Sequence, residues 1–394
     1  MTEKEYKHIE TKLIHSGEPS PKILGAVNVP IFQSAMFETL REKDYDSIPY
    51  IRLNNTPNHQ ALREKLAAVE NAEDALVTAS GMAAISATLL TVLTKGDHLL
   101  VENCLYGGTH DFVTRDLEGF GIAYDFIEPD DTGGWERKLR PNTRAIYVET
   151  MTNPLLEVAD HRKVVELAKS RKLVSIIDNT FASPINFRPA EHGFDLSLHS
   201  ATKYLNGHSD IVAGAVVGKA ELVGKVKHRL NHLGGSLDPH ACYLLHRGMM
   251  TLALRMRQHN ESALKIARFL ESHPSVKRVN YPGLESHPHH TRASELFNGY
   301  GGMMSFELAG GQEAAMRFIK SVTIPITAPS LGGVHSLITI PAFTSHTGMS
   351  REDLLKLGIT DGLIRFSAGI EDTEDLIEDF RQALEVSTAP KMTA

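Results

Sequence analysis

From about residue 60 onward, short apolar segments alternate with longer segments that carry apolar residues at helical spacing. In the segment 60–70, Leu62, Leu66 and Val69 lie three or four residues apart, which predicts one apolar face of a helix. The predicted strands of this part of the chain are 74–79, 98–101, 123–127, 145–148, 173–177, 196–199 and 211–217. Alternation of helices with largely apolar strands is typical of an α/β fold, with a mainly parallel sheet and helices on both faces.

The chain divides into three predicted regions. Residues 1–59 show little periodicity and are interrupted by five prolines, so we expect an N-terminal arm that packs on another subunit. Residues 60–250 should form the domain with the parallel sheet. Residues 251–394 begin with a long amphipathic helix and predict a smaller α/β domain, with strands at 303–308 and 363–366.

The composition favours a small-molecule partner. The formal net charge of −7 argues against a general nucleic-acid binder. The N-terminus lacks the apolar core of a signal peptide, and the longest apolar stretch, 83–93, is too short to span a bilayer. Cys104 and Cys242 lie far apart and have no spaced Cys or His companions. We therefore expect no disulfide framework, no metal site and no membrane partner, and a cytoplasmic location.

Lys203 is the first candidate for cofactor binding. It lies in SLHSATKYLNGH at the end of a predicted apolar strand, flanked by Ser200 and Thr202. A partly desolvated lysine can form a Schiff base with an aldehyde, and two small hydroxyl residues on one strand face can bind a phosphate. The segment therefore indicates pyridoxal 5′-phosphate (PLP). The alternative is an ordinary exposed lysine.

Asp178 ends the predicted strand VSIID, one crossover before Lys203. PLP requires a carboxylate against its pyridine nitrogen, because the protonated ring then accepts electrons from the reacting carbon. Ligands of parallel sheets bind at the carboxyl ends of the strands, where this aspartate should lie. Alone, Asp178 would be predicted to cap the turn at Asn179 and Thr180; together with Lys203 it favours the cofactor.

Two further segments fit a phosphorylated aromatic cofactor. Ser80, Gly81 and Met82 form a predicted turn between a strand and a helix, whose backbone N–H groups would face an anion. Tyr106, in LYGGT, could stack on the pyridine ring. Each is weak alone, since such turns are usually plain helix starts and single tyrosines usually pack. The histidine-rich segment 287–290 predicts a solvated loop rather than a metal site.

These segments occur together with others in a fixed order, and the set resembles the Cys/Met-metabolism (trans-sulfuration) family of PLP enzymes. The resemblance extends from about residue 10 to 385. The segments that carry it are SGMAAI, LYGGT with Tyr106, ETMTNP with Asn153, DNTFASP with Asp178, SATKY with Lys203, SLGG at Ser330 and LIRFSAGIED with Arg365.

The resemblance implies a type I (aspartate-aminotransferase-like) fold and a homotetramer made of two close dimers. It implies that Lys203 carries the cofactor and shuttles protons, that Asp178 pairs with the pyridine nitrogen, and that Tyr106 stacks on the ring. Arg365 would clamp the substrate α-carboxylate. The other implied site residues are Ser80, Gly81, Met82, Ser200 and Thr202 for the cofactor phosphate, Tyr50 and Arg52 for the phosphate of the neighbouring subunit, Asn153 for cofactor and substrate, and Ser330 for substrate.

The implied activity is that of a carbon–sulfur lyase on sulfur amino acids, of the cystathionine γ-lyase, cystathionine β-lyase or methionine γ-lyase kind. It would release a thiol, a 2-oxo acid and ammonia. Pro49 and Pro329 occupy positions that are often acidic in γ-lyases, Gly108 replaces the cysteine of methionine γ-lyases, and His335 replaces a common glutamate. The alternative is γ-replacement, as in cystathionine γ-synthase or O-acylhomoserine sulfhydrylase, because both reactions share their early steps.

Overall fold

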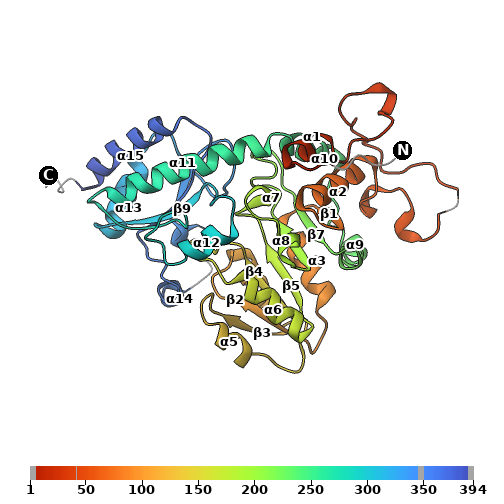
Figure 1. The fold of residues 1–394 in the computed structure, drawn as a ribbon, viewed down its shortest axis with the longest axis horizontal. Helices are drawn as coiled ribbons and strands as arrows, with labels where there is room; N and C mark the ends of the chain where they lie inside the picture. The colour runs from red at the N-terminus through yellow and green to blue at the C-terminus, as the bar shows by residue number, and fades with distance from the viewer. Residues whose placement is uncertain (1–5, 41, 345–349, 389–394) are drawn as a thin grey trace. The chain divides into compact units, whose positions relative to one another are not determined.

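The computed structural model describes residues 6–40, 42–344 and 350–388. The chain forms two compact units (Figure 1). The first unit contains residues 1–103, 112–150 and 159–253, and the second contains residues 104–111, 151–158 and 254–394. Two short segments, one with Tyr106 and one with Asn153, therefore belong to the second unit although the sequence on both sides of them belongs to the first. A division of the chain into continuous ranges does not show this.

A seven-stranded sheet forms the centre of the first unit, in the order β1-β7-β6-β5-β4-β2-β3. Only β7 runs against the others, since it pairs antiparallel with both β1 and β6. The mainly parallel sheet predicted from the sequence is confirmed. The strands are β1 (Asp74–Thr78), β2 (His98–Glu102), β3 (Ala123–Ile127), β4 (Thr143–Glu149), β5 (Val174–Asp178), β6 (Leu196–His199) and β7 (Gly214–Gly218).

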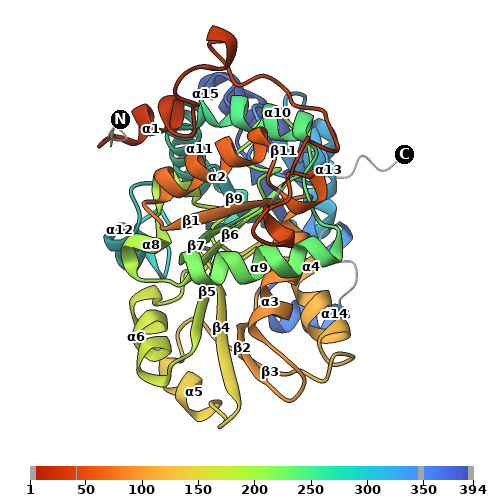
Figure 2. The same ribbon diagram turned by 90° about the vertical axis from the view of Figure 1, so that its right-hand side faces the viewer.

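Helices cover both faces of this sheet. Figure 2 shows α6 and α3 on opposite sides of the strands, and α3 also packs on α9. The helices of the unit are α1 (Ile9–His15), α2 (Pro57–Glu70), α3 (Gly81–Val92), α5 (Thr132–Arg137), α6 (His161–Arg171), α7 (Ser183–Asn186), α8 (Pro189–His192), α9 (Ala220–Leu233) and α10 (Pro239–Met249). The helix α1 lies in a region that the sequence predicted to be without periodic structure.

The second unit contains a five-stranded sheet in the order β10-β11-β12-β9-β8. Its strands are β8 (Val276–Asn280), β9 (Met303–Leu308), β10 (Ile326–Thr327), β11 (Leu337–Thr339) and β12 (Leu363–Ser367). Its helices are α4 (Gly107–Asp111), α11 (Leu252–Ser272, whose first two residues belong to the first unit), α12 (His290–Leu296), α13 (Gly311–Ser321), α14 (Arg351–Lys356) and α15 (Thr373–Thr388).

One face of the second sheet packs on α11, α13 and α15. Phe306 of β9 and Phe366 of β12 meet Phe318 of α13 and Phe380 of α15 in a cluster of edge-to-face and tilted rings. Because side chains alternate along a strand, the residue before Phe366 points to the opposite face. That residue is Arg365, which the sequence assigned to substrate binding.

The histidine-rich segment is not the solvated loop that the sequence predicted. His287 and His289 are 6% and 8% exposed. The Nδ1 atom of His289 accepts a hydrogen bond from the backbone N–H of Val158 at 2.9 Å, so this histidine satisfies the backbone rather than facing water. Within the described residues, no group of three or more His, Cys, Asp or Glu side chains could hold a metal ion.

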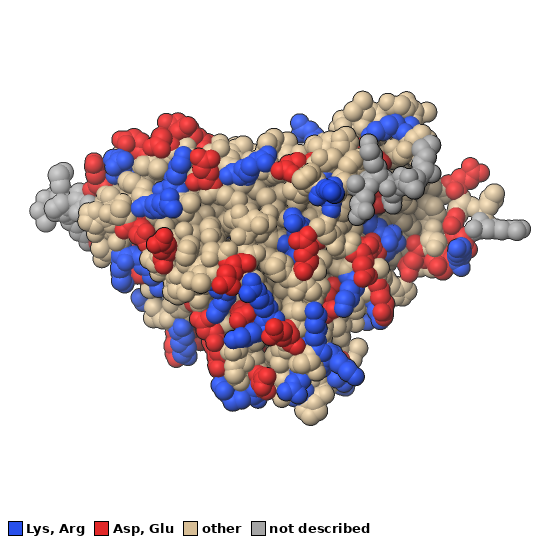
Figure 3. Space-filling model, in the orientation of Figure 1, with Lys and Arg blue, Asp and Glu red and all other residues tan. Residues whose placement is uncertain are grey.

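Charged side chains of both signs are interspersed on the face drawn in Figure 3. Several form pairs one helical turn apart, such as Lys265 with Glu261 at 2.9 Å, and exposed pairs of this kind contribute little to stability. Cys104 and Cys242 are both buried and are not joined in a disulfide. Among the described helices, none combines the length and the apolar character needed to cross a bilayer.

Candidate active site

Asp178 is the last residue of β5, at the carboxyl edge of the parallel sheet. It is 9% exposed and lies beside Glu149 of β4 and Leu198 of β6 in the strand register. The sequence predicted this position. Because β1 runs parallel to β5 and β6, the turn after β1 lies at the same edge.

Thr180 joins Asp178 to Ser200. The backbone N–H of Thr180 donates to Oδ1 of Asp178 at 2.9 Å, and the hydroxyl oxygen of Thr180 accepts from the backbone N–H of Ser200 at 2.8 Å. Burial raises the pKa of Asp178, although the hydrogen bonds from Thr180 oppose this shift. A buried carboxylate of this kind gains most from a cationic partner. The sequence analysis did not identify Thr180, which follows Asp178 by only two residues.

A second layer of polar groups supports Asp178. His199 of β6 is hydrogen-bonded to Glu70 of α2, and both side chains are at most 1% exposed. The charge of His199 and a hydrogen bond from Tyr147 of β4 favour the ionised form of Asp178. No local pattern indicates this layer, because Glu70 and His199 are 129 residues apart in the chain.

The turn after β1 provides unpaired backbone donors. Ser80 caps α3: its hydroxyl accepts from the N–H of Ala83 at 3.0 Å, and its carbonyl accepts from the N–H of Ala84. The N–H groups of Gly81 and Met82 are left without a recorded acceptor in the described part of the chain. A Cβ atom on Gly81 would lie 2.9 Å from Cβ of Ser200, so only glycine permits this close approach.

Lys203 and Thr202 lie in a turn, not on a strand. The strand β6 ends at His199, so the prediction of two hydroxyls on one strand face is wrong: Ser200 and Thr202 are brought to the same edge by a turn. The N–H of Lys203 donates to the carbonyl of Ser200 at 3.1 Å. In this structure the hydroxyl of Thr202 donates to the carbonyl of Ala213 at 3.2 Å, and it must rotate to donate elsewhere.

The first unit therefore fits PLP at three points. The free N–H groups of Gly81 and Met82, at the N-terminus of a twelve-residue helix, suit a phosphate. The buried carboxylate of Asp178 suits a protonated pyridine nitrogen, and the turn after β6 supplies the amine of Lys203. These groups come from elements that follow three different strands, which is why no single segment of sequence reveals the site.

The second unit assembles a separate group around Arg365 on β12. Its guanidinium is 5% exposed and donates to Oδ1 of Asn153 at 3.2 Å and to the carbonyl of Ser330 at 3.2 Å. Ser330 has a φ of 96°, an uncommon backbone conformation for a residue with a side chain. Burial lowers the pKa of Arg365 to about 10, while Tyr106 opposes the shift electrostatically. Arg365 stays cationic at neutral pH.

Tyr106, Asn153, Ser330 and Arg365 all belong to this second unit, and Tyr106 is 45% exposed. Pro329 and His335, which flank the SLGG segment, are both exposed. The second unit thus presents a cation held in place by two neutral acceptors, next to an exposed aromatic ring. A planar guanidinium in such a setting suits a carboxylate ligand.

Arg52 lies in a short 3₁₀ segment before α2, Ile51–Leu53, and Tyr50 is the extended residue that precedes it. Arg52 donates to the carbonyl of Asn231 on α9 at 2.8 Å, and its guanidinium lies 5.6 Å from the ring of Tyr50. The residues that follow are fixed by local contacts. Asn55 accepts from the N–H of Tyr50 at 2.9 Å, and Pro57 begins α2 at the first helical position, where its missing N–H does no harm.

The sequence matches the profile of the Cys/Met metabolism PLP-dependent enzymes over residues 10–385. The chain is 42% identical to cystathionine gamma-lyase of Bacillus subtilis (strain 168), over 95% of this chain and 99% of that protein. It is 41% identical to cystathionine beta-lyase MetC of the same bacterium, over 95% of this chain and 96% of that protein.

A crystal structure of cystathionine gamma-lyase from Lactobacillus plantarum, complexed with L-serine, superposes with a TM-score of 0.92. That chain is 39% identical, and the match covers 98% of this chain and all of the other. The predicted family, type I fold, PLP cofactor and carbon–sulfur lyase class are confirmed. The chain belongs to the Cys/Met metabolism family of PLP-dependent enzymes.

Proposed function

We propose that this protein cleaves a carbon–sulfur bond of cystathionine. The products are a thiol amino acid, a 2-oxo acid and ammonia. The observation that carries the substrate class is the buried Arg365 with its two hydrogen-bonded supports, Asn153 and Ser330, since this group suits the α-carboxylate of an amino acid. The relatives named above are cystathionine lyases, which supports cystathionine among the sulfur amino acids.

Asp178 would strengthen the electron-withdrawing effect of the cofactor ring. When bound, PLP draws electrons away from the carbon next to the substrate amino group, and it does so best with a protonated ring nitrogen. The carboxylate of Asp178 would hold that proton on the nitrogen. Thr180, His199 and Tyr147 favour the ionised form that this task needs, against the desolvation that disfavours it.

Lys203 would move the protons. Its Nζ atom would hold the cofactor and would be the base that takes the proton from the α-carbon of the substrate. Loss of a β-thiolate can follow directly. Loss of a γ-thiolate requires a second proton to leave the β-carbon, and the same amine is placed to take it. The turn formed by residues 200–207 holds the backbone of Lys203 in place. It is closed by a hydrogen bond from the N–H of Gly207 to the carbonyl of Lys203 at 2.8 Å.

Arg365 would fix the substrate by its α-carboxylate, through charge-assisted hydrogen bonds. Ser330 and Asn153 hold the guanidinium in place before the substrate arrives. The exposed Pro329 precedes Ser330, so this position offers no carboxylate to the distal ammonium group of cystathionine. The choice between β- and γ-cleavage therefore needs a direct measurement.

The products distinguish the reactions. Cleavage on the γ side of cystathionine yields cysteine, 2-oxobutanoate and ammonia, whereas cleavage on the β side yields homocysteine, pyruvate and ammonia. Purified holoenzyme should be given cystathionine, methionine or O-succinylhomoserine, each with and without cysteine, and the 2-oxo acids identified by mass spectrometry. Formation of either 2-oxo acid from cystathionine supports the proposal. A product that forms only from O-succinylhomoserine and cysteine would replace it with γ-replacement.

We also infer a homotetramer in the cytoplasm, in which the arm 1–59 contacts the neighbouring subunit, followed by a PLP domain (60–250) and a C-terminal domain (251–394). Large apolar side chains of the arm support the contact, because Leu24, Met36 and Leu40 are 103%, 73% and 92% exposed. Tyr50 and Arg52 would reach the neighbouring cofactor phosphate from the end of this arm. Light scattering of the full chain and of a Leu24→Ser, Leu40→Ser variant tests the inference, which predicts a smaller assembly for the variant.

A further inference from the structure

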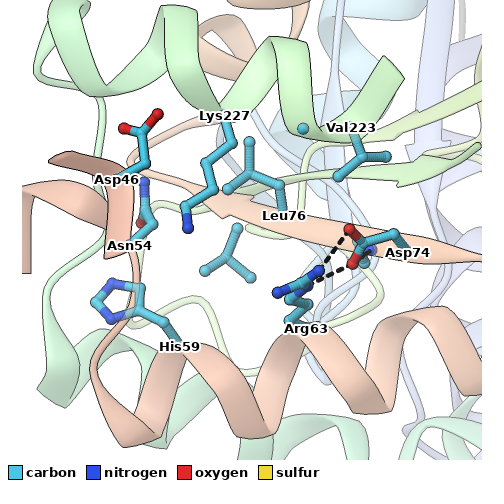
Figure 4. Close-up of a pocket in the computed structure, with 11 residues that line it drawn as sticks. Asp46, Asn54, His59, Arg63, Asp74, Leu76, Val223 and Lys227 are labelled. Carbon is cyan, nitrogen blue, oxygen red and sulfur yellow. Dashed lines mark hydrogen bonds and ion pairs between the residues drawn. The ribbon is translucent and has the colours of Figure 1, made fainter. Parts of the chain in front are cut away.

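A cavity of about 230 Å³ lies in the first unit, among the segment before α2, helix α2, strand β1 and helix α9 (Figure 4). Its lining residues are Asp46, Asn54, His59, Arg63, Asp74, Ala75, Leu76, Val77, Val223, Gly224 and Lys227. None of these residues belongs to the proposed PLP or substrate groups. The cavity is smaller than the sites that hold drug-sized ligands, which usually exceed about 300 Å³.

The acidic side chains of this cavity are already paired. Asp74 accepts hydrogen bonds from Nε and Nη2 of Arg63, the latter at 2.7 Å, as Figure 4 shows. The Oδ2 atom of Asp46 is hydrogen-bonded to Nδ1 of His228 at 2.7 Å, and its Oδ1 atom accepts a hydrogen bond from Nδ2 of Asn231 at 2.9 Å. Although burial raises the pKa of Asp46, these hydrogen bonds lower it below the usual value. Both carboxylates are therefore satisfied within the wall.

Two cationic groups remain. Among the described residues, Lys227 has no recorded hydrogen bond or ion pair, and its ammonium points from α9 into the cavity (Figure 4). Burial lowers its pKa, and the charge of Arg63 lowers it further. The Nη1 atom of Arg63 likewise has no recorded acceptor in the described ranges. His59 does not add a charge at neutral pH, because burial lowers its pKa to about 4.

A buried amide adds a second, independent sign of a ligand. Asn54 is 7% exposed, and neither Nδ2 nor Oδ1 has a hydrogen-bond partner in the described part of the chain. A buried polar group without a partner is destabilising, so such groups usually meet a ligand, an ion or ordered water. Asn54 lines the same cavity as Lys227.

Gly224 of α9 offers a position at which the cavity can be filled. It is exposed and lines the cavity, and a Cβ atom added there would meet nothing within 4 Å. Part of the wall is apolar, formed by Leu76 and Val77 of β1 and Val223 of α9.

We propose that this cavity binds a small organic anion, a short-chain carboxylate or a phosphate monoester, through the Lys227 ammonium, Nη1 of Arg63 and the amide of Asn54. The oxyanion meets the two cations, and its carbon chain lies on the apolar wall. The site lies outside the proposed catalytic groups. Its occupancy can therefore be measured separately from turnover.

Binding should be measured by isothermal titration calorimetry on the holoenzyme. The probes are butyrate, glycerol 3-phosphate and inorganic phosphate, with butylamine as the cationic control. At least one of the two organic anions should bind with saturation in a way that Lys227→Met weakens, so that a carboxylate bound at Arg365 is not counted, and butylamine should not bind. Saturation by butyrate or by glycerol 3-phosphate identifies the head group. Binding of inorganic phosphate alone, or of no anion, overturns the proposal.

Three variants separate the site from general effects. Lys227→Met should weaken anion binding roughly tenfold or more, the loss expected for one charge-assisted hydrogen bond. Lys225→Met is the matched control, because Lys225 lies two residues away on α9, pairs with Glu221 at 2.5 Å and does not line the cavity. Gly224→Leu should abolish binding while leaving the melting temperature equal or higher. Unchanged affinity in Lys227→Met would refute the assignment.

Discussion

Each of the two units buries one ionisable side chain on a strand, and the two side chains carry opposite charges. The first unit buries Asp178 at the end of β5, and the second buries Arg365 in the middle of β12. Desolvation disfavours the charged form in both, raising the pKa of Asp178 and lowering that of Arg365 to about 10. The consequences differ. A pKa of about 10 leaves Arg365 cationic at neutral pH, whereas a raised pKa makes the ionised form of Asp178 less favourable there.

The difference shows which residue depends on its ligand. Arg365 keeps its charge unaided, and its supports Asn153 and Ser330 are neutral acceptors of the same chain. The ionisation of Asp178 is assisted by Thr180 and by the charge of His199, and a pyridinium nitrogen would add the missing cation. We therefore expect the Arg365 group to be complete without ligand and the Asp178 group to become complete with the cofactor.

Arg365→Leu should have the largest effect on catalysis. It removes two charge-assisted hydrogen bonds to the substrate carboxylate, worth about 1.5–3 kcal/mol each, so kcat/KM should fall by about 10²–10⁴-fold. Cofactor affinity, measured by fluorescence titration, should change little. Arg365→Lys retains the charge but loses the fork and should recover part of the activity. Equal losses of cofactor binding and activity in the leucine variant would contradict the separation of the two groups.

Asp178→Asn should act on both catalysis and stability, with opposite signs. Removing the carboxylate from the developing charge should lower kcat by about 10²–10³-fold. The apoprotein should instead become more stable at neutral pH, because a carboxyl group whose folded pKa is raised destabilises the native state once it ionises. The stability gain should shrink as the pH falls toward about 4, the unfolded value. Thermal melts of apoprotein and variant at pH 5 and 7.5 measure it.

Sequence reasoning recovered the elements that depend on local order. The alternation from residue 60 predicted the parallel sheet, and the residues at strand ends, Asp178 and the turn at Gly81, were placed correctly. It failed where the chain folds back. Ser200 and Thr202 lie in a turn rather than on a strand, because the strand stops at His199. The histidines at 287 and 289 are buried against backbone, which no local pattern could show.

The supporting residues could not be predicted for a related reason. Glu70 and His199 are far apart in sequence and adjacent only because α2 packs against the sheet. Tyr147 contacts the site from another strand. Hydrogen bonds of this kind depend on tertiary packing, and one sequence carries no record of which polar residues meet. Thr180 is the exception, since a hydroxyl two residues after a strand-end aspartate is a local signal.

Gly81→Ala should have a smaller effect, confined to the first unit. The added Cβ would lie 2.9 Å from Cβ of Ser200 and 3.0 Å from its Oγ, so the helix N-terminus and Ser200 must move apart. We expect cofactor affinity to fall by roughly tenfold, while KM at saturating cofactor stays within about twofold. Gly119→Ala is the matched control, since its nearest contact would be a carbonyl oxygen at 3.2 Å far from these groups in sequence. A loss of affinity in both variants would point to general destabilisation.

The pH dependence of carboxylate binding gives the smallest effect and the sharpest test of Arg365. Because burial lowers its folded pKa to about 10, the side chain is fully cationic below about pH 9 and loses its proton as the pH rises through 10. Inhibition by propionate, which has no amine to titrate, should be constant to pH 9 and weaken about twofold at pH 10, then by about tenfold per further unit. Since burial also lowers the pKa of a lysine, the Arg365→Lys variant should lose propionate inhibition at a lower pH. A flat profile to pH 11 would mean that the guanidinium is not desolvated as its 5% exposure implies, and the contrast with Asp178 would then fail on that side.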